Sequence, residues 1–77
     1  MEREEIITYD PQDSWGWPAL RIEDCDGDVV ARIEVDTIGC LRHYLASHHD
    51  WTAAELSAVS RTFLDISNLA ADRGVTL

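Results

Sequence analysis

The sequence predicts a small α+β domain in which a three-stranded antiparallel sheet (β-β-β) is followed by a helical hairpin packed on one face. Residues 1–36 alternate apolar and polar side chains with the period of a strand, whereas residues 37–77 space their apolar side chains with the period of a helix. The 77 residues suffice for a single domain, 1–77, with one small core. An apolar content of 45% excludes a disordered chain.

The clearest local signal is Asp26-Gly27, which is typical of a two-residue hairpin loop because type I′ turns need positive φ angles. Apolar residues alternate on both sides of it: Leu20 and Ile22 before, and Val29, Ala31, Ile33 and Val35 after. With this loop, Ile22 lies opposite Ala31 and Leu20 opposite Ile33. Both apolar faces then lie on the same side of the hairpin.

A third strand is predicted over residues 5–9, ending at Asp10-Pro11 and joining the hairpin as an edge strand. Two tryptophans then bracket Gly16 in a connection that is otherwise polar. The favoured interpretation is that one or both rings fold back and close one end of the core. The alternative is an apolar anchor for a partner, and both hold together if Trp17 turns inward and Trp15 points outward.

The first predicted helix covers residues 38–47, with Asp36 or Thr37 as its N-cap. Its apolar stripe consists of Ile38, Leu41 and Leu45. The loop His48-His49-Asp50 then leads to the second helix.

The second helix carries signals at both ends. It begins with the capping box Thr52-x-x-Glu55, beside a hydrophobic staple between Trp51 and Leu56. It ends at Arg73, with Gly74 as the residue after the cap. Its predicted core stripe is Leu56, Val59, Phe63, Ile66 and Ala70.

Charge is distributed unevenly along the chain. The formal net charge is −9, of which residues 1–36 carry −8 and residues 37–77 carry −1. A nucleic-acid-binding surface is excluded, since affinity for phosphates requires a basic patch. Charge that only keeps the protein in solution is the alternative interpretation. The residues predicted to bind a protein partner are Asp10, Asp13, Trp15, Glu23, Asp24, Asp26 and Asp28.

The sequence gives little support for a metal site or a catalytic site. A calcium loop starting at Asp24 would need Gly and Glu where Val29 and Val35 stand. The set Cys40, His43, His48 and His49 matches no zinc spacing. There is no nucleophile elbow and no glycine-rich phosphate loop. We therefore expect a protein that is not an enzyme and binds no metal or cofactor.

The cellular setting is also predicted from composition. No apolar run exceeds three residues, so we expect no signal peptide and no contact with a membrane. Two cysteines are too few for a disulfide scaffold and are expected to be free thiols. Together these features predict a cytoplasmic protein of bacterial or phage type.

In length, charge and layout the whole chain resembles the small acidic phage-encoded inhibitors of the anti-CRISPR type. Their shared properties lie in no motif, so the resemblance carries over no individual residue. It implies a protein that binds a CRISPR effector complex in the host cytoplasm and blocks its access to target DNA. Carboxylates two apart on a strand repeat at about 6.6–6.8 Å, about twice the 3.4 Å rise per phosphate of one DNA strand.

The alternative function comes from another class of protein. It is a small self-associating regulatory or neutralising module, as antitoxins and immunity proteins are, which binds one partner through tryptophan and apolar contacts. Leu64, Leu69 and Trp15 would form an apolar patch that pairs two copies as a homodimer. Binding by an acidic mimic should weaken steeply with salt, whereas binding through an apolar patch should not.

Overall fold

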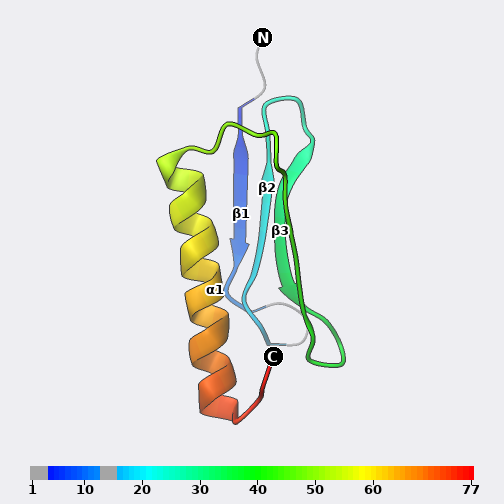
Figure 1. Cartoon of the computed structure of the whole chain (residues 1–77), viewed down its shortest axis with the longest axis vertical. Helices are drawn as coiled ribbons and strands as arrows, with labels where there is room; N and C mark the ends of the chain where they lie inside the picture. The colour runs from blue at the N-terminus through cyan, green and yellow to red at the C-terminus, as the bar shows by residue number, and fades with distance from the viewer. Residues whose placement is uncertain (1–3, 13–15) are drawn as a thin grey trace.

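The computed structural model describes residues 4–12 and 16–77. Four antiparallel strands form a meander in the order β1-β2-β3-β4, and one helix follows them (Figure 1). The elements are β1 (Ile6–Asp10), β2 (Ala19–Glu23), β3 (Val29–Val35), β4 (Leu41–Leu45) and α1 (Ala53–Arg73). The molecule is elongated, 46 × 22 × 19 Å, and α1 runs alongside the sheet. Within the described ranges no helix is long and apolar enough to cross a membrane.

The prediction for the first three strands is confirmed. Strand β1 is an edge strand paired with β2, and β2 pairs with β3 in the predicted register, Leu20 opposite Ile33 and Ile22 opposite Ala31. A register shift next to Ile22 makes Val30 an extra residue in β3, so that Val30 and Ala31 are both buried.

The prediction of a two-residue turn at Asp26-Gly27 is wrong. The Asp24 N–H donates to the carbonyl of Asp28 at 2.9 Å, and the Gly27 N–H donates to the carbonyl of Asp24 at 3.0 Å. Gly27 alone in this loop has a positive φ, 88°. These features belong to a longer loop, in which a type I turn is followed by a glycine in the left-handed region.

The predicted helix over residues 38–47 is also wrong, because this segment contains β4. It pairs antiparallel with β3, with Leu41 opposite Val35 and Leu45 opposite Ala31. Asp36 is therefore not a helix N-cap, and Thr37 is exposed in the loop that joins β3 to β4. The fold has one C-terminal helix packed on a four-stranded sheet instead of a helical hairpin on three strands.

The β2–β3 loop and the β3–β4 loop share one motif. In the sequences Asp24-Cys-Asp-Gly-Asp28 and Asp36-Thr-Ile-Gly-Cys40, the first aspartate turns its Oδ1 onto the backbone. Asp24 Oδ1 accepts from the N–H groups two and four residues later, both at 2.9 Å. Asp36 Oδ1 accepts from the equivalent groups at 3.1 and 2.8 Å. The second Asp-x-x-Gly was the available signal for β4.

Asp36 is expected to make stability depend on pH. The N–H groups of Cys40 and Ile38 and the guanidinium of Arg42 stabilise its charged form, and they hold the pKa of its carboxyl below the usual value. The pKa of an Asp in an unfolded chain is about 3.9. The Asp36 carboxylate therefore contributes stability above that pH, and this contribution is lost as the pH falls through the lower pKa of the folded state.

Urea unfolding of the wild type and Asp36→Asn tests this expectation. The stability difference between them should shrink as the pH is lowered from neutral, because the wild type loses an advantage that the neutral variant never had. A difference that stays constant over the acidic range would contradict the assignment.

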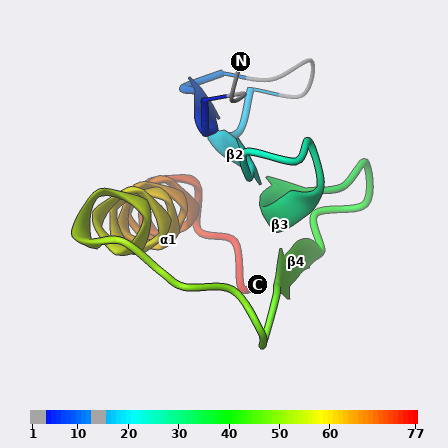
Figure 2. The ribbon, with the colours of Figure 1, turned by 90° about the horizontal axis from the view of Figure 1, so that it is seen from above.

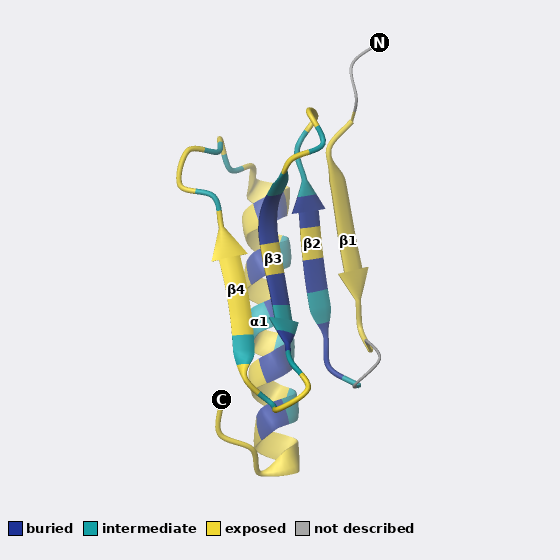
Figure 3. Ribbon diagram, turned by 90° about the vertical axis from the view of Figure 1, so that its right-hand side faces the viewer, coloured by how far each residue is buried: buried dark blue, intermediate teal, exposed yellow. Residues whose placement is uncertain are grey.

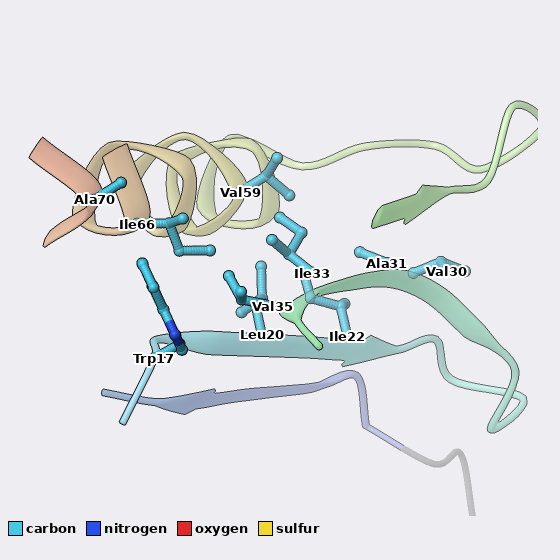
Figure 4. Close-up of a cluster of buried hydrophobic side chains, with 10 residues drawn as sticks. All are labelled: Trp17, Leu20, Ile22, Val30, Ala31, Ile33, Val35, Val59, Ile66 and Ala70. Atoms are coloured by element: carbon cyan, nitrogen blue, oxygen red, sulfur yellow. The ribbon is translucent and has the colours of Figure 1, made fainter. Parts of the chain in front are cut away.

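The core lies between α1 and the inner face of the sheet (Figure 4). Its buried apolar residues are Trp17, Leu20, Ile22, Val30, Ala31, Ile33, Val35, Val59, Ile66 and Ala70. Trp17 points inward, as predicted, and the Arg73 guanidinium lies 4.6 Å from its ring centroid. Arg73 also donates to the carbonyl of Gly16 at 3.0 Å. The end of α1 is thereby held against the segment that enters β2.

Both predicted helix ends are confirmed. The Thr52–Glu55 capping box is complete, and Gly74 has a left-handed backbone with φ 66°. Gly74 donates to the carbonyl of Ala71 at 3.2 Å and Val75 to that of Ala70 at 2.9 Å, which forms a Schellman motif.

The predicted core stripe of α1 is wrong at its start. The buried residues are Glu55, Val59, Thr62, Ile66 and Ala70, while Phe63 is only partly buried (Figure 3). Leu56 is 52% exposed and so does not belong to the core. The stripe begins at the charged Glu55 because that carboxylate has polar partners at the N-cap, Thr52, and in the loop before the helix, His49.

Strand β4 is left largely uncovered. The helix approaches β1, β2 and β3 but makes no close backbone approach to β4. Viewed from above, β4 stands apart from α1, with the C-terminal residues between them (Figure 2). Four of the five β4 residues are exposed, as are all five of β1, where Tyr9 donates to Asp65 of the helix at 2.7 Å.

Candidate functional site: an acidic end of the sheet

The structure divides the predicted partner-binding residues between the two ends of the sheet. Glu23, Asp24, Asp26 and Asp28 lie at the loop between β2 and β3, at the end where β1 begins (Figure 1). Asp10 lies opposite Ala19, at the other end. Asp13 and Trp15 lie outside the described residues.

The β2–β3 loop belongs to a larger acidic end of the molecule. Residues just before β1 and around the start of α1 lie at this same end (Figure 1). We use the term acidic end for the carboxylates gathered there: Glu4, Glu5, Glu23, Asp24, Asp26, Asp28, Asp50 and Glu55. Six of the nine carboxylates that the structure describes in residues 4–36 therefore lie at one narrow end, together with two carboxylates from the second half of the chain.

Some of these carboxylates hold the fold together. Asp24 Oδ1 accepts two backbone hydrogen bonds in its loop. Arg21 donates to Glu23 at 3.3 Å, and the Glu23 side chain is only 21% exposed. Glu23 and Asp24 are thus only partly exposed, whereas Asp26 and Asp28 are exposed.

A cluster that the sequence analysis missed lies at the same end. His49 Nε2 is 2.7 Å from Glu55 Oε2, and the Thr52 N–H donates to Glu55 Oε1 at 2.8 Å. Polar atoms of Glu5, His49 and Glu55 all lie within 4.8 Å of one another. Two of these residues come from the helix start and its preceding loop, and the third precedes β1.

The environment of Glu55 favours its charged form. Its side chain is fully buried, and burial alone would raise the pKa of the carboxyl. The hydrogen bonds from Thr52 and the contact with His49 outweigh burial, so the pKa is lowered. The His49 ring meets the Trp51 ring edge to face, with centroids 4.8 Å apart. The side chains of Glu55 and His49 are therefore both held in fixed positions.

The metal ligands considered from the sequence are not brought together. Cys40 lies in the β3–β4 loop, at the end opposite His49. His43, in β4, packs edge to face on Phe63 with centroids 5.8 Å apart. His48 is exposed. Cys25 and Cys40 are exposed free thiols at opposite ends of β3.

An apolar groove of about 470 Å³ lies beside β4, between the second half of α1 and the C-terminal residues. Its lining includes Leu41, Phe63, Ile66 and Val75. Of the residues in the predicted apolar patch, Leu64 is 59% exposed, Leu69 packs against the core, and Trp15 lies outside the described residues.

No family model, curated protein or solved structure matches this chain.

Proposed function

We propose that this protein is a non-enzymatic inhibitor that inserts its acidic end into the nucleic-acid-binding groove of a partner protein. In the form we favour, it is an anti-CRISPR-type protein, and the partner is a CRISPR effector complex that loses access to target DNA. The observation that carries the proposal is the concentration of carboxylates at one narrow end of an elongated molecule. A groove that binds phosphates is basic and attracts such a surface.

The arrangement of the acidic end supports this mode of binding. Asp26 and Asp28 project at the loop, while Asp24 fixes the loop backbone through two hydrogen bonds. The exposed charges therefore sit on an ordered turn and lose little conformational freedom on binding. The opposite end of the molecule stays outside the groove and needs no complementary surface.

The double variant Asp26→Asn/Asp28→Asn should bind a CRISPR effector complex about fivefold more weakly at low salt, although each exposed ion pair contributes little. Asp24 is left unchanged because it accepts the backbone hydrogen bonds of the loop, and Glu23 because it pairs with Arg21. Competition between the protein and fluorescent target duplex for the purified complex measures this effect. The loss should appear mainly in the association rate and diminish as salt increases.

A matched control changes the same charge elsewhere. Glu34→Gln/Asp72→Asn removes two carboxylates that lie outside the acidic end, and should leave competition nearly unchanged. Equal effects of the two double variants would show that net charge alone matters. Binding of the protein to a complex that already holds its target duplex, with no loss in either variant, would exclude nucleic-acid mimicry.

The alternative function, a self-associating or neutralising module, is favoured by the apolar groove beside β4. The groove and the exposed β4 belong to residues 37–77, which carry a net charge of only −1. Two copies, or a copy and an apolar partner segment, would meet there with little repulsion. In the same competition experiment this function predicts binding that is insensitive to salt and to Asp26→Asn/Asp28→Asn.

A further inference from the structure

We infer that Glu5, His49 and Glu55 form a binding site for a divalent transition-metal ion of the Zn²⁺ class. The inference does not depend on the proposed function, and it revises the expectation that the chain binds no metal. Among the described residues, these three bring together one imidazole nitrogen and two carboxylates within 4.8 Å. Imidazole and carboxylate are common zinc ligands, and three protein ligands leave one position for water.

Two of the ligands are already oriented. Glu55 is fully buried, and the Thr52 N–H holds its Oε1 at 2.8 Å while Oε2 faces His49. The His49 ring, whose side chain is 15% exposed, is fixed by the edge-to-face contact with Trp51. Hydrogen bonds and packing that orient a metal's ligands are typical of sites with high affinity.

The third ligand, Glu5, reaches the site from the surface of the molecule. Glu5 is exposed and comes from a segment distant in sequence, just before β1. Zinc bonds of about 2.0–2.1 Å place tetrahedral ligand atoms roughly 3.3 Å apart, so the His49–Glu55 pair at 2.7 Å must open slightly and Glu5 must move inward. The exposed side chain of Glu5 is free to make that movement.

Charge gives a physical reason for a cation at this place. The carboxylates of Glu5 and Glu55 converge on a single imidazole, and the surrounding acidic end adds to the negative potential. Like charges at this separation repel one another. An ion bound by His49 Nε2 and the two carboxylates removes that repulsion, and the N–H of the neutral ring then lies on Nδ1.

The test measures Zn²⁺ and Co²⁺ binding to the full chain with Cys25→Ser and Cys40→Ser, because exposed thiols also bind zinc. We expect one ion per chain by calorimetry, a rise in Tm on adding Zn²⁺, and Co²⁺ absorption bands typical of low coordination number. Mg²⁺ and Ca²⁺ should bind much more weakly, because imidazole favours transition metals.

Adjacent residues supply matched controls. His49→Gln and Glu5→Gln should each weaken Zn²⁺ binding at least tenfold, whereas His48→Gln and Glu4→Gln should leave it unchanged. Glu5→Gln alters an exposed side chain, so it keeps the test decisive if His49→Gln fails to fold. Absence of binding at millimolar Zn²⁺, equal effects at His48 and His49, or one ion shared between two chains would each overturn the site.

Discussion

Ile33→Ala is expected to lower the free energy of unfolding by about 2–5 kcal/mol, the usual cost of truncating a large buried aliphatic side chain. Ile33 is fully buried, lies in the central strand β3, and pairs with Leu20 on one side and His43 on the other. A domain of this size has little stability in excess of such a loss. Urea unfolding followed by circular dichroism measures the change.

Ile38→Ala is the matched control, because it makes the same chemical change at a side chain that is 81% exposed. Its effect should stay below about 0.5 kcal/mol. Comparable losses in the two variants would contradict the position of β4. In the predicted helix Ile38 belonged to the apolar stripe, whereas in the structure it lies in the β3–β4 loop.

Glu55→Ala is expected to cost about 2–4 kcal/mol, combining the loss of a capping interaction with polar groups left unpaired in a buried site. Glu55 accepts from the Thr52 N–H, contacts His49 and is fully buried. The variant also leaves a cavity beneath the first turn of α1. Unfolding should be measured with a chelator present, so that metal binding does not contribute.

Glu55→Gln separates the contributions of shape and charge. Its amide oxygen keeps an acceptor for the Thr52 N–H and nearly the same volume, so it should lose less stability than Glu55→Ala. The alanine variant proving as stable as the wild type would show that the capping box and the His49 contact contribute nothing to the fold. Similar losses in both variants would assign the stabilisation to the negative charge itself.

Features set by neighbouring residues could be predicted from the sequence. Thr52 and Glu55 are three residues apart, and Gly74 follows Arg73 directly, so the helix ends depend on short-range hydrogen bonds. The register of β2 against β3 follows from the alternation of apolar residues on either side of one loop. The bulge at Val30 accompanies a loop that differs from the predicted one, but Leu20 and Ile22 keep their predicted partners in β3.

The segment from residue 38 to 47 could not be assigned from its own pattern. Ile38, Leu41 and Leu45 have helical spacing, but Leu41 and Leu45 are also an even number of residues apart and so share a face of a strand. The choice depends on the free hydrogen-bonding edge of β3 and on the turn that Asp36 forms. Pairing with β3 satisfies the backbone groups of both strands and outweighs local preference.

For the candidate sites, too, the sequence predicted some features and the tertiary structure decided others. The acidic loop was identified because its carboxylates are consecutive or alternate in the chain, but its separation from Asp10 follows from where β1 ends. The sequence by itself determined the register of β2 against β3, both ends of α1 and the overall excess of negative charge, since each depends on residues close in the chain or on composition. Only the tertiary structure decided that β4 is a strand, because its backbone pairs with the free edge of β3. It also decided that Glu5 meets His49 and Glu55, because that contact forms only when the start of α1 packs against the sheet.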